Sequence, residues 1–222
     1  VQGDLRPAAA AGQVRVKRLV TDADILAWFA KLQKTHETQL SAKELGLPQK
    51  EWMTTEDDVD AKGRPIKRRV ERMVATREVS LLKGETDAKR LELPQLNGGD
   101  PRPFEVVGIP LAEPGYHVVE IESLRLGQAL LDKREPMYVR TGVLVTNLGV
   151  HVKAGGENTV VWVTTLDRGR PVEGAEIAIN DCNGKKLWSG TTDAQGLARA
   201  NQRFDEQPND CAAEHALFVR SE

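Results

Sequence analysis

The sequence predicts a mainly β fold, with two tandem antiparallel β-sandwiches of which the first carries a helical insertion. From residue 76 onwards, apolar and polar residues alternate in runs of strand length, and turn signals rich in Gly, Pro, Asn and Asp separate the runs. In the second half the runs recur about every ten residues, and about seven short strands in about 80 residues are the signature of a sandwich. The sequence therefore favours sheets over helices along most of its length.

The composition is that of a nearly neutral globular protein. The 222 residues include 31 Lys and Arg against 33 Asp and Glu, whereas a nucleic-acid binder needs a strong basic excess. Hydrophobic residues make up 40% of the chain, so cores can form. No stretch approaches the roughly 18 uninterrupted apolar residues of a membrane helix. We therefore expect no nucleic acid among the partners, and a membrane only through an anchor outside this segment.

We expect this chain to be a segment of a longer polypeptide. It opens with Val1-Gln2-Gly3 in place of an initiator Met, and it stops just after the strand-like run at residues 216–219. Residues 1–12 lack periodicity and are expected to be a frayed lead-in. A targeting signal would then lie upstream.

The first domain is predicted to span residues 13–135. Apolar and basic residues alternate over residues 14–20, which indicates a half-buried strand. A helix follows, because Thr21 or Asp22 can cap it and apolar residues then recur at spacings of three and four. We assign a helical segment to about residues 21–75, and four strand-length runs complete the domain.

One stretch of the first domain separates its charges. Acidic residues at 56–60 are followed by basic residues at 62–72, and a functional interpretation would make the basic cluster a docking patch for anions. The adjacent acidic run cancels most of that field beyond a Debye length. We favour a solvated or mutually paired surface.

The second domain is predicted to span residues 136–222. The charged, Pro-containing stretch Asp132-Lys133-Arg134-Glu135-Pro136 lies between the two series of strands and is our predicted boundary. Strands after it are separated by turn signals such as Asn183-Gly184 and Asp193-Ala194-Gln195-Gly196.

No catalytic, cofactor-binding or metal-binding residues are predicted. The chain lacks GxSxG, HExxH, GxGxxG and a phosphate-cradling loop. Single histidines such as His117 and His151, flanked by apolar residues, are more often core or cross-strand residues than bases. We therefore expect the chain not to be an enzyme.

Alternation also predicts where other polar and aromatic residues lie. Glu105, Glu120 and Glu176 have apolar neighbours on both sides, so the period of a strand points them to solvent. Trp162 and Trp188 could stack on a sugar, but in a sandwich a Trp more commonly fills the core between the sheets.

Cys182 and Cys211 are the only cysteines and lie 29 positions apart. A zinc site would need two further ligands, and the four histidines are scattered singly. Both cysteines lie in Asn- and Asp-rich stretches, which predicts exposed positions. We favour a disulfide between them over two free thiols, and a disulfide implies an oxidising compartment.

Two hairpins in the second domain resemble those of macroglobulin-like (MG) domains. The pattern is TLDxGxPVxGAxIxI at residues 165–179, then a Cys, then GTTDxxGLA at residues 190–198. Residues 21–28, 103–116 and 138–148 resemble the corresponding stretches of bacterial alpha-2-macroglobulins. The resemblance covers nearly the whole chain, departs from the family at residues 40–75, and implies two consecutive MG domains, which are immunoglobulin-like sandwiches.

The resemblance implies a function for the whole parent protein. Alpha-2-macroglobulins are broad-spectrum protease traps in which a protease cuts a bait segment, and in many members a Cys-Gln thioester tethers it. Neither element occurs here, because Cys182 and Cys211 are not followed by the Glu-Gln of the thioester motif. The implied role is a non-catalytic scaffold whose partners are neighbouring domains, target proteases through the parent, and envelope proteins.

Bacterial members of the family are periplasmic and often lipid-anchored, so the resemblance places this chain in the periplasm, with the parent anchored in the inner membrane as a lipoprotein. The alternative is a pair of tandem immunoglobulin-like modules from an adhesin or a carbohydrate-binding surface protein. An exposed linear row of aromatic residues would favour that alternative.

Overall fold

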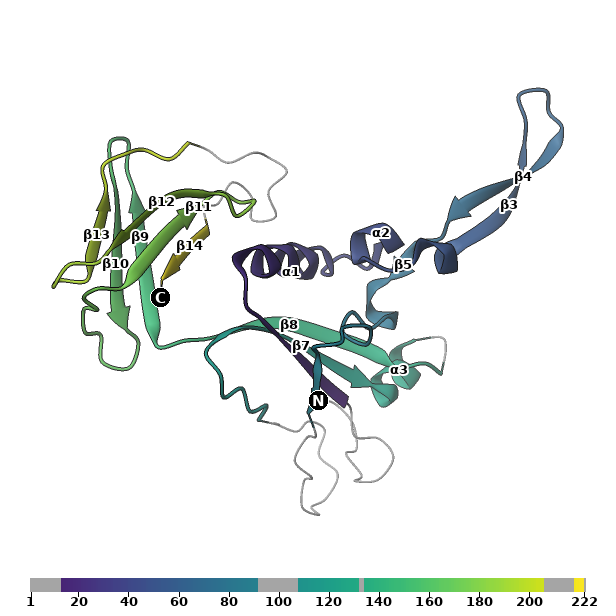
Figure 1. The fold of residues 1–222 in the computed structure, drawn as a ribbon. Helices are drawn as coiled ribbons and strands as arrows, with labels where there is room; N and C mark the ends of the chain where they lie inside the picture. Colours follow the sequence, from purple (N-terminus) through teal and green to yellow (C-terminus); the bar gives the residue numbers. More distant parts are fainter. Residues whose placement is uncertain (1–12, 92–107, 132–133, 206–217, 222) are drawn as a thin grey trace, which may run out of the picture. The chain divides into compact units, whose positions relative to one another are not determined.

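The computed structural model describes residues 13–91, 108–131, 134–205 and 218–221, and the predicted mainly β fold class is confirmed (Figure 1). Every paired strand is antiparallel, and helices are few. The chain divides into two compact units: unit 1 comprises residues 1–19 and 31–143, and unit 2 comprises residues 20–30 and 144–222. In the described part of the chain, no helix has the length and apolar content to cross a membrane.

Unit 1 is built on a four-stranded sheet with β1 and β7 at its centre. Val14 and Val16 of β1 pair with Ile121 and Val119 of β7, and these residues form a core with partly buried apolar neighbours. The two-residue period of a strand explains why Val14 and Val16 are both buried, because alternate residues of β1 lie on the same face. In sheet order the strands are β6 (Lys89–Leu91), β1 (Gln13–Leu19), β7 (Gly115–Ser123) and β8 (Met137–Val145).

The predicted helix after β1 is α1 (Asp22–Lys34). The Thr21 hydroxyl accepts a hydrogen bond from the backbone N–H of Asp24 at 3.1 Å, which caps the first turn. Asp22 and Asp24 lie in the first turn and Lys31 and Lys34 in the last, as the helix dipole favours. Residues 20–30, which include the first part of α1, group with unit 2, and the rest of the helix groups with unit 1.

The structure corrects the predicted domain boundary. The division falls between Val143 and Leu144, rather than at residues 132–136, because Met137–Val145 forms strand β8 of the unit 1 sheet. The assignment of residues 20–30 to unit 2 is a second difference from the predicted domain of residues 13–135. The first difference arises because β8 pairs with β7, the strand before it, and the second agrees with the ion pair between Asp22 and Arg220.

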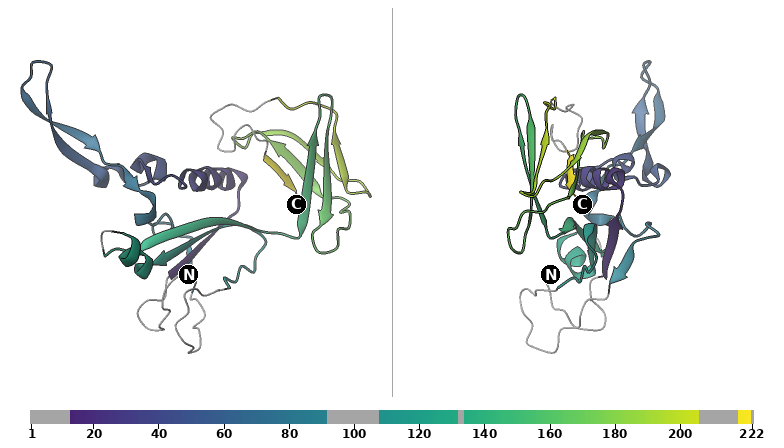
Figure 2. Two further views of the ribbon diagram at one scale, coloured as in Figure 1. Left: turned by 180° about the vertical axis from the view of Figure 1, so that it is seen from behind. Right: turned by 60° about the vertical axis from the view of Figure 1, so that its left-hand side comes forward.

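The predicted helical segment at residues 21–75 is also corrected. Only α1 and the single turn α2 are α-helical there. The strongest feature is a hairpin of two seven-residue strands that extends away from the unit 1 sheet (Figures 1 and 2). Gly63 has a φ of 74° in its turn, a conformation that favours glycine. The elements are β2 (Gln39–Leu40), α2 (Ala42–Leu45), the 3-10 helix η1 (Gln49–Trp52), β3 (Met53–Val59), β4 (Pro65–Glu71), β5 (Val74–Ala75) and the 3-10 helix η2 (Thr76–Glu78).

Mutual pairing of the charges in the hairpin is confirmed. The acidic run lies on β3 and its turn, and the basic residues lie opposite on β4 and the same turn. Lys67 Nζ lies 3.5 Å from an Asp57 oxygen, and Arg64 Nη2 lies 2.7 Å from an Asp60 oxygen. None of the residues in β3 or β4 is buried. The hairpin therefore adds little apolar burial to unit 1.

We predict that replacing residues 56–68 with a short Gly-Ser turn changes the free energy of unfolding of the chain by less than about 1 kcal/mol. A two-stranded hairpin is only marginally stable on its own, and exposed ion pairs add little to stability. Urea titration followed by circular dichroism measures this difference. A loss above about 2 kcal/mol would mean that the hairpin supports the core of unit 1.

Helix α3 (Leu124–Leu130) contains a glycine that packing requires. A Cβ at Gly127 would stand 1.8 Å from the backbone oxygen of Glu135, which cannot move aside as a flexible side chain can. We expect Gly127→Ala to destabilise the chain by about 1 to 3 kcal/mol, although alanine favours helices. Gly84→Ala is the matched control, because a Cβ at Gly84 meets nothing within 4 Å. Equal melting temperatures for the two variants would contradict this account.

Unit 2 contains two three-stranded antiparallel sheets. Its core consists of buried residues from both sheets, Val161 and Val163 from one and Ile177 and Ile179 from the other, with Trp188 packed against them. In sheet order the strands are β13 (Leu197–Ala200), β10 (Thr159–Thr165) and β9 (Leu148–Ala154), and then β12 (Lys186–Thr191), β11 (Glu176–Asn180) and β14 (Phe218–Ser221).

Candidate functional site

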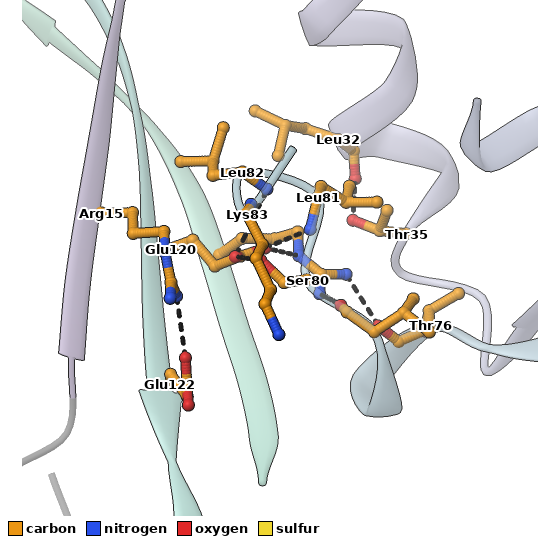
Figure 3. A network of polar contacts seen from close by, with 12 residues as sticks. Arg15, Leu32, Thr35, Thr76, Ser80, Leu81, Leu82, Lys83, Glu120 and Glu122 are labelled. Atoms are coloured by element: carbon orange, nitrogen blue, oxygen red, sulfur yellow. Dashed lines mark hydrogen bonds and ion pairs between the residues drawn. The ribbon is translucent and has the colours of Figure 1, made fainter. Parts of the chain in front are cut away.

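The deepest charged group among the described residues is Glu120 of β7, which has no exposed surface. The prediction that it faces solvent is wrong. Alternation correctly separates Glu120 from its buried neighbour Val119, but residues 76–82 cover the other face of the sheet at this point (Figure 3). Glu176 is exposed as predicted, and Glu105 lies outside the described residues.

Four groups donate hydrogen bonds to the Glu120 carboxylate. The Ser80 hydroxyl and the Leu82 N–H donate to Oε1, the latter at 3.4 Å, and the Leu81 N–H donates to Oε2 at 2.8 Å (Figure 3). Arg140 Nε of β8 donates to Oε2 at 3.3 Å. A buried carboxylate needs such partners, since burial without them is costly.

Arg140 is almost as buried, with 5% of its side chain exposed. Its other two nitrogens donate to the backbone oxygens of Thr76 at 2.8 Å and Val79 at 2.5 Å. Burial lowers the pKa of the Arg140 guanidinium, and the neighbouring Glu120 charge opposes that effect. An arginine keeps its proton in proteins. The pair therefore holds residues 76–82 against β7 and β8, and it offers no free proton acceptor for acid–base chemistry.

The two strand histidines lie in different environments. His117 is buried, with its Nε2 2.9 Å from the backbone oxygen of Glu113, in agreement with a core position. His151 is exposed on β9 and lies opposite Trp162 of β10, with ring centroids 5.5 Å apart, so the expected cross-strand position is confirmed. Within the described ranges, no group of three His, Cys, Asp or Glu residues could hold a metal ion.

Cys182 lies in the turn between β11 and β12. It is only 8% exposed, so the expectation of an exposed position is wrong for this residue. The turn is held by Asp181, whose carboxylate accepts from the N–H groups of Asn183 and Lys185. The expected partner, Cys211, lies outside the described residues, and the pairing of Cys182 with Cys211 stays a prediction.

The two tryptophans differ as well. Trp188 is half-buried and packs against the core of unit 2, as predicted. Trp162 is 43% exposed, and its prediction as a core residue is wrong. Val161 and Val163 occupy the inner face of β10, so the residue between them must point outward.

A surface hollow of about 350 Å³ lies in unit 2 beside the ion pair of Asp22 and Arg220, whose nearest atoms are 2.5 Å apart. Its other charged residues are Glu176 and Lys186, and small residues of β11 and β12 form the floor. Ser189 and Thr191 also line the hollow, and strand register places Thr191 opposite Glu176.

Residues 145–221 match the family model of the bacterial alpha-2-macroglobulin MG3 domain. That match covers about a third of the chain. The match coincides with the C-terminal segment of unit 2, residues 144–222, whose boundary comes from the structure alone. The resemblance seen in the hairpins at residues 165–179 and 190–198 is confirmed, and the MG3 domain lies on the C-terminal side of the chain.

Two solved structures resemble the whole chain. A fragment of native alpha-2-macroglobulin from Escherichia coli spanning domains NIE-MG1 has 15% sequence identity and a TM-score of 0.46, over 97% of this chain and 81% of that one. A fragment of the same protein spanning MG0-NIE-MG1 has 16% identity and a TM-score of 0.42, over 95% of this chain and 52% of that one. No curated protein sequence matches the chain.

Proposed function

We propose that this chain is a non-catalytic scaffold and interaction segment of a bacterial alpha-2-macroglobulin, and that the whole molecule is a broad-spectrum protease trap. The match of residues 145–221 to the MG3 domain carries the proposal. The arrangement of charges supports it, because the buried pair of Glu120 and Arg140 is fully engaged in holding the fold. The partners are then neighbouring domains, target proteases through the parent, and envelope proteins.

We place the protein in the periplasm, with the parent anchored to the inner membrane as a lipoprotein. The predicted disulfide between Cys182 and Cys211 would require an oxidising compartment. Fractionation of cells that express the full-length parent tests this placement. Recovery in the cytoplasmic fraction, with both cysteines as free thiols, would contradict it.

Protease trapping can be tested with the full-length parent protein. After incubation with a protease, a trap should block cleavage of a large protein substrate and leave hydrolysis of a small chromogenic peptide almost unchanged, because a caged protease admits only small substrates. The chain of residues 1–222 alone should inhibit neither reaction. Equal inhibition of both substrates, or of neither, by the full-length protein would contradict protease trapping.

Absence of catalysis is tested with the chain itself. The purified chain should turn over no protease, esterase or glycosidase substrate, because no nucleophile, base and orienting group occur at a recognisable spacing in the sequence. Turnover that one point mutation abolishes would overturn this part of the proposal.

A further inference from the structure

The outer face of the sheet β13–β10–β9 in unit 2 carries an unusual combination of side chains. Strand register places Leu197, Trp162 and His151 in one row across the three strands. The next row, two residues along each strand, contains Arg199, Val160 and Lys153. Successive rows on one face of a sheet lie about 7 Å apart, so one extended segment of a partner can contact both.

Trp162 is held in place and presents an apolar surface. Its indole N–H donates to the backbone oxygen of Gln195 at 3.1 Å, so the polar edge of the ring is already engaged. The ring lies 5.5 Å from that of His151, at an angle of 36°. A side chain fixed before binding loses little conformational freedom when a partner covers it.

The charge beside Trp162 is positive and uncompensated. Lys153 and Arg199 are both exposed, and neither makes an ion pair with a described residue. The three strands β9, β10 and β13 contain no Asp or Glu, although the chain as a whole has 33. In the hairpin of β3 and β4, by contrast, exposed basic residues lie opposite acidic ones.

We propose that this face docks an acidic, extended segment of a partner protein. An apolar side chain of the segment lies on the Trp162 ring, and a carboxylate two residues along meets Lys153 and Arg199. Trp and Arg are enriched among the residues that dominate binding energy, and complementary charge selects the partner. This inference rests on the proposed interaction role of the segment and does not depend on protease trapping.

The test uses synthetic twelve-residue peptides and the whole chain. The acidic probe has Leu-Phe at its centre flanked by Asp and Glu, and the basic probe has Lys in place of every acidic residue. Titration is followed by the indole NMR signal of Trp162, which is assigned with Trp162→Phe. We expect the acidic probe to bind at least tenfold more tightly than the basic one, and binding to weaken as salt rises.

Charge reversal provides the matched comparison. The double variant K153E/R199E should weaken binding of the acidic probe at least tenfold and should strengthen binding of the basic probe. The variant K67E/R68E makes the same change in net charge on the hairpin and should bind like the wild type. Melting curves check that both variants fold.

Three results would overturn the inference. The first is equal binding of the two probes, or none by the acidic one. The second is an equal loss of affinity for the acidic probe in the K67E/R68E variant. The third is binding of a neutral oligosaccharide such as cellohexaose that Trp162→Ser abolishes and K153E/R199E preserves, because it would assign the face to glycans. None of these results bears on whether the full-length parent traps proteases, so the two proposals can fail separately.

Discussion

Replacing Arg140 with Met should lower the free energy of unfolding of the chain by about 3 to 5 kcal/mol. The substitution removes the cation beside Glu120, whose carboxylate has no exposed surface. It also removes the donors to the backbone oxygens of Thr76 and Val79. Urea titration measures the effect, and the covering segment at residues 76–82 should exchange its amide hydrogens faster.

Two further variants test whether the loss of stability comes from breaking the buried ion pair or from removing any basic side chain. Glu120→Leu in the Arg140→Met background should recover part of the stability, because replacing a whole buried pair with apolar residues is far less costly than breaking it. Lys67→Met breaks the exposed pair with Asp57 and should cost less than about 1 kcal/mol. If Arg140→Met is no more destabilised than Lys67→Met, the buried pair does not hold residues 76–82.

Reduction of the predicted Cys182–Cys211 disulfide should lower the stability of unit 2 by about 3 to 4 kcal/mol without altering its fold. A bridge across 29 positions restricts the unfolded chain, and the chain-entropy relation for a loop of that length predicts this value. Such a loss is a large part of the roughly 5 to 15 kcal/mol that a domain possesses. Thermal melts with and without reductant measure it.

Thiol titration of the unreduced, denatured protein is the direct check on the pairing. No free thiol should be detected, and mass spectrometry of a digest should join the peptides that contain Cys182 and Cys211. The double variant Cys182→Ser/Cys211→Ser should melt lower than the wild type and should not respond to reductant. Two free thiols, or a melting temperature that reduction leaves unchanged, would defeat both the bridge and the oxidising compartment inferred from it.

Local pattern was enough to predict the elements that depend on neighbours in sequence. The helix after Thr21 follows from its cap and from apolar residues at spacings of three and four. The strands of unit 2 follow from alternation, and their hairpin motifs at residues 165–179 and 190–198 were enough to predict the MG domain. Pairing of the charges at residues 56–72 was also predictable, because an acidic run and a basic run lie on either side of one turn.

The fold class, the MG domain of unit 2 and the alternation of side chains in its strands could therefore be predicted from the order of the residues. Which faces of the sheets are covered depends on tertiary packing. Glu120 follows the buried Val119, and Trp162 lies between the buried Val161 and Val163. Residues 76–82 nevertheless bury Glu120, whereas Trp162 remains 43% exposed. The boundary at Val143, too, depends on the pairing of β8 with β7. Strand periodicity fixes two faces but not what packs on each, because the covering segment comes from a distant part of the chain.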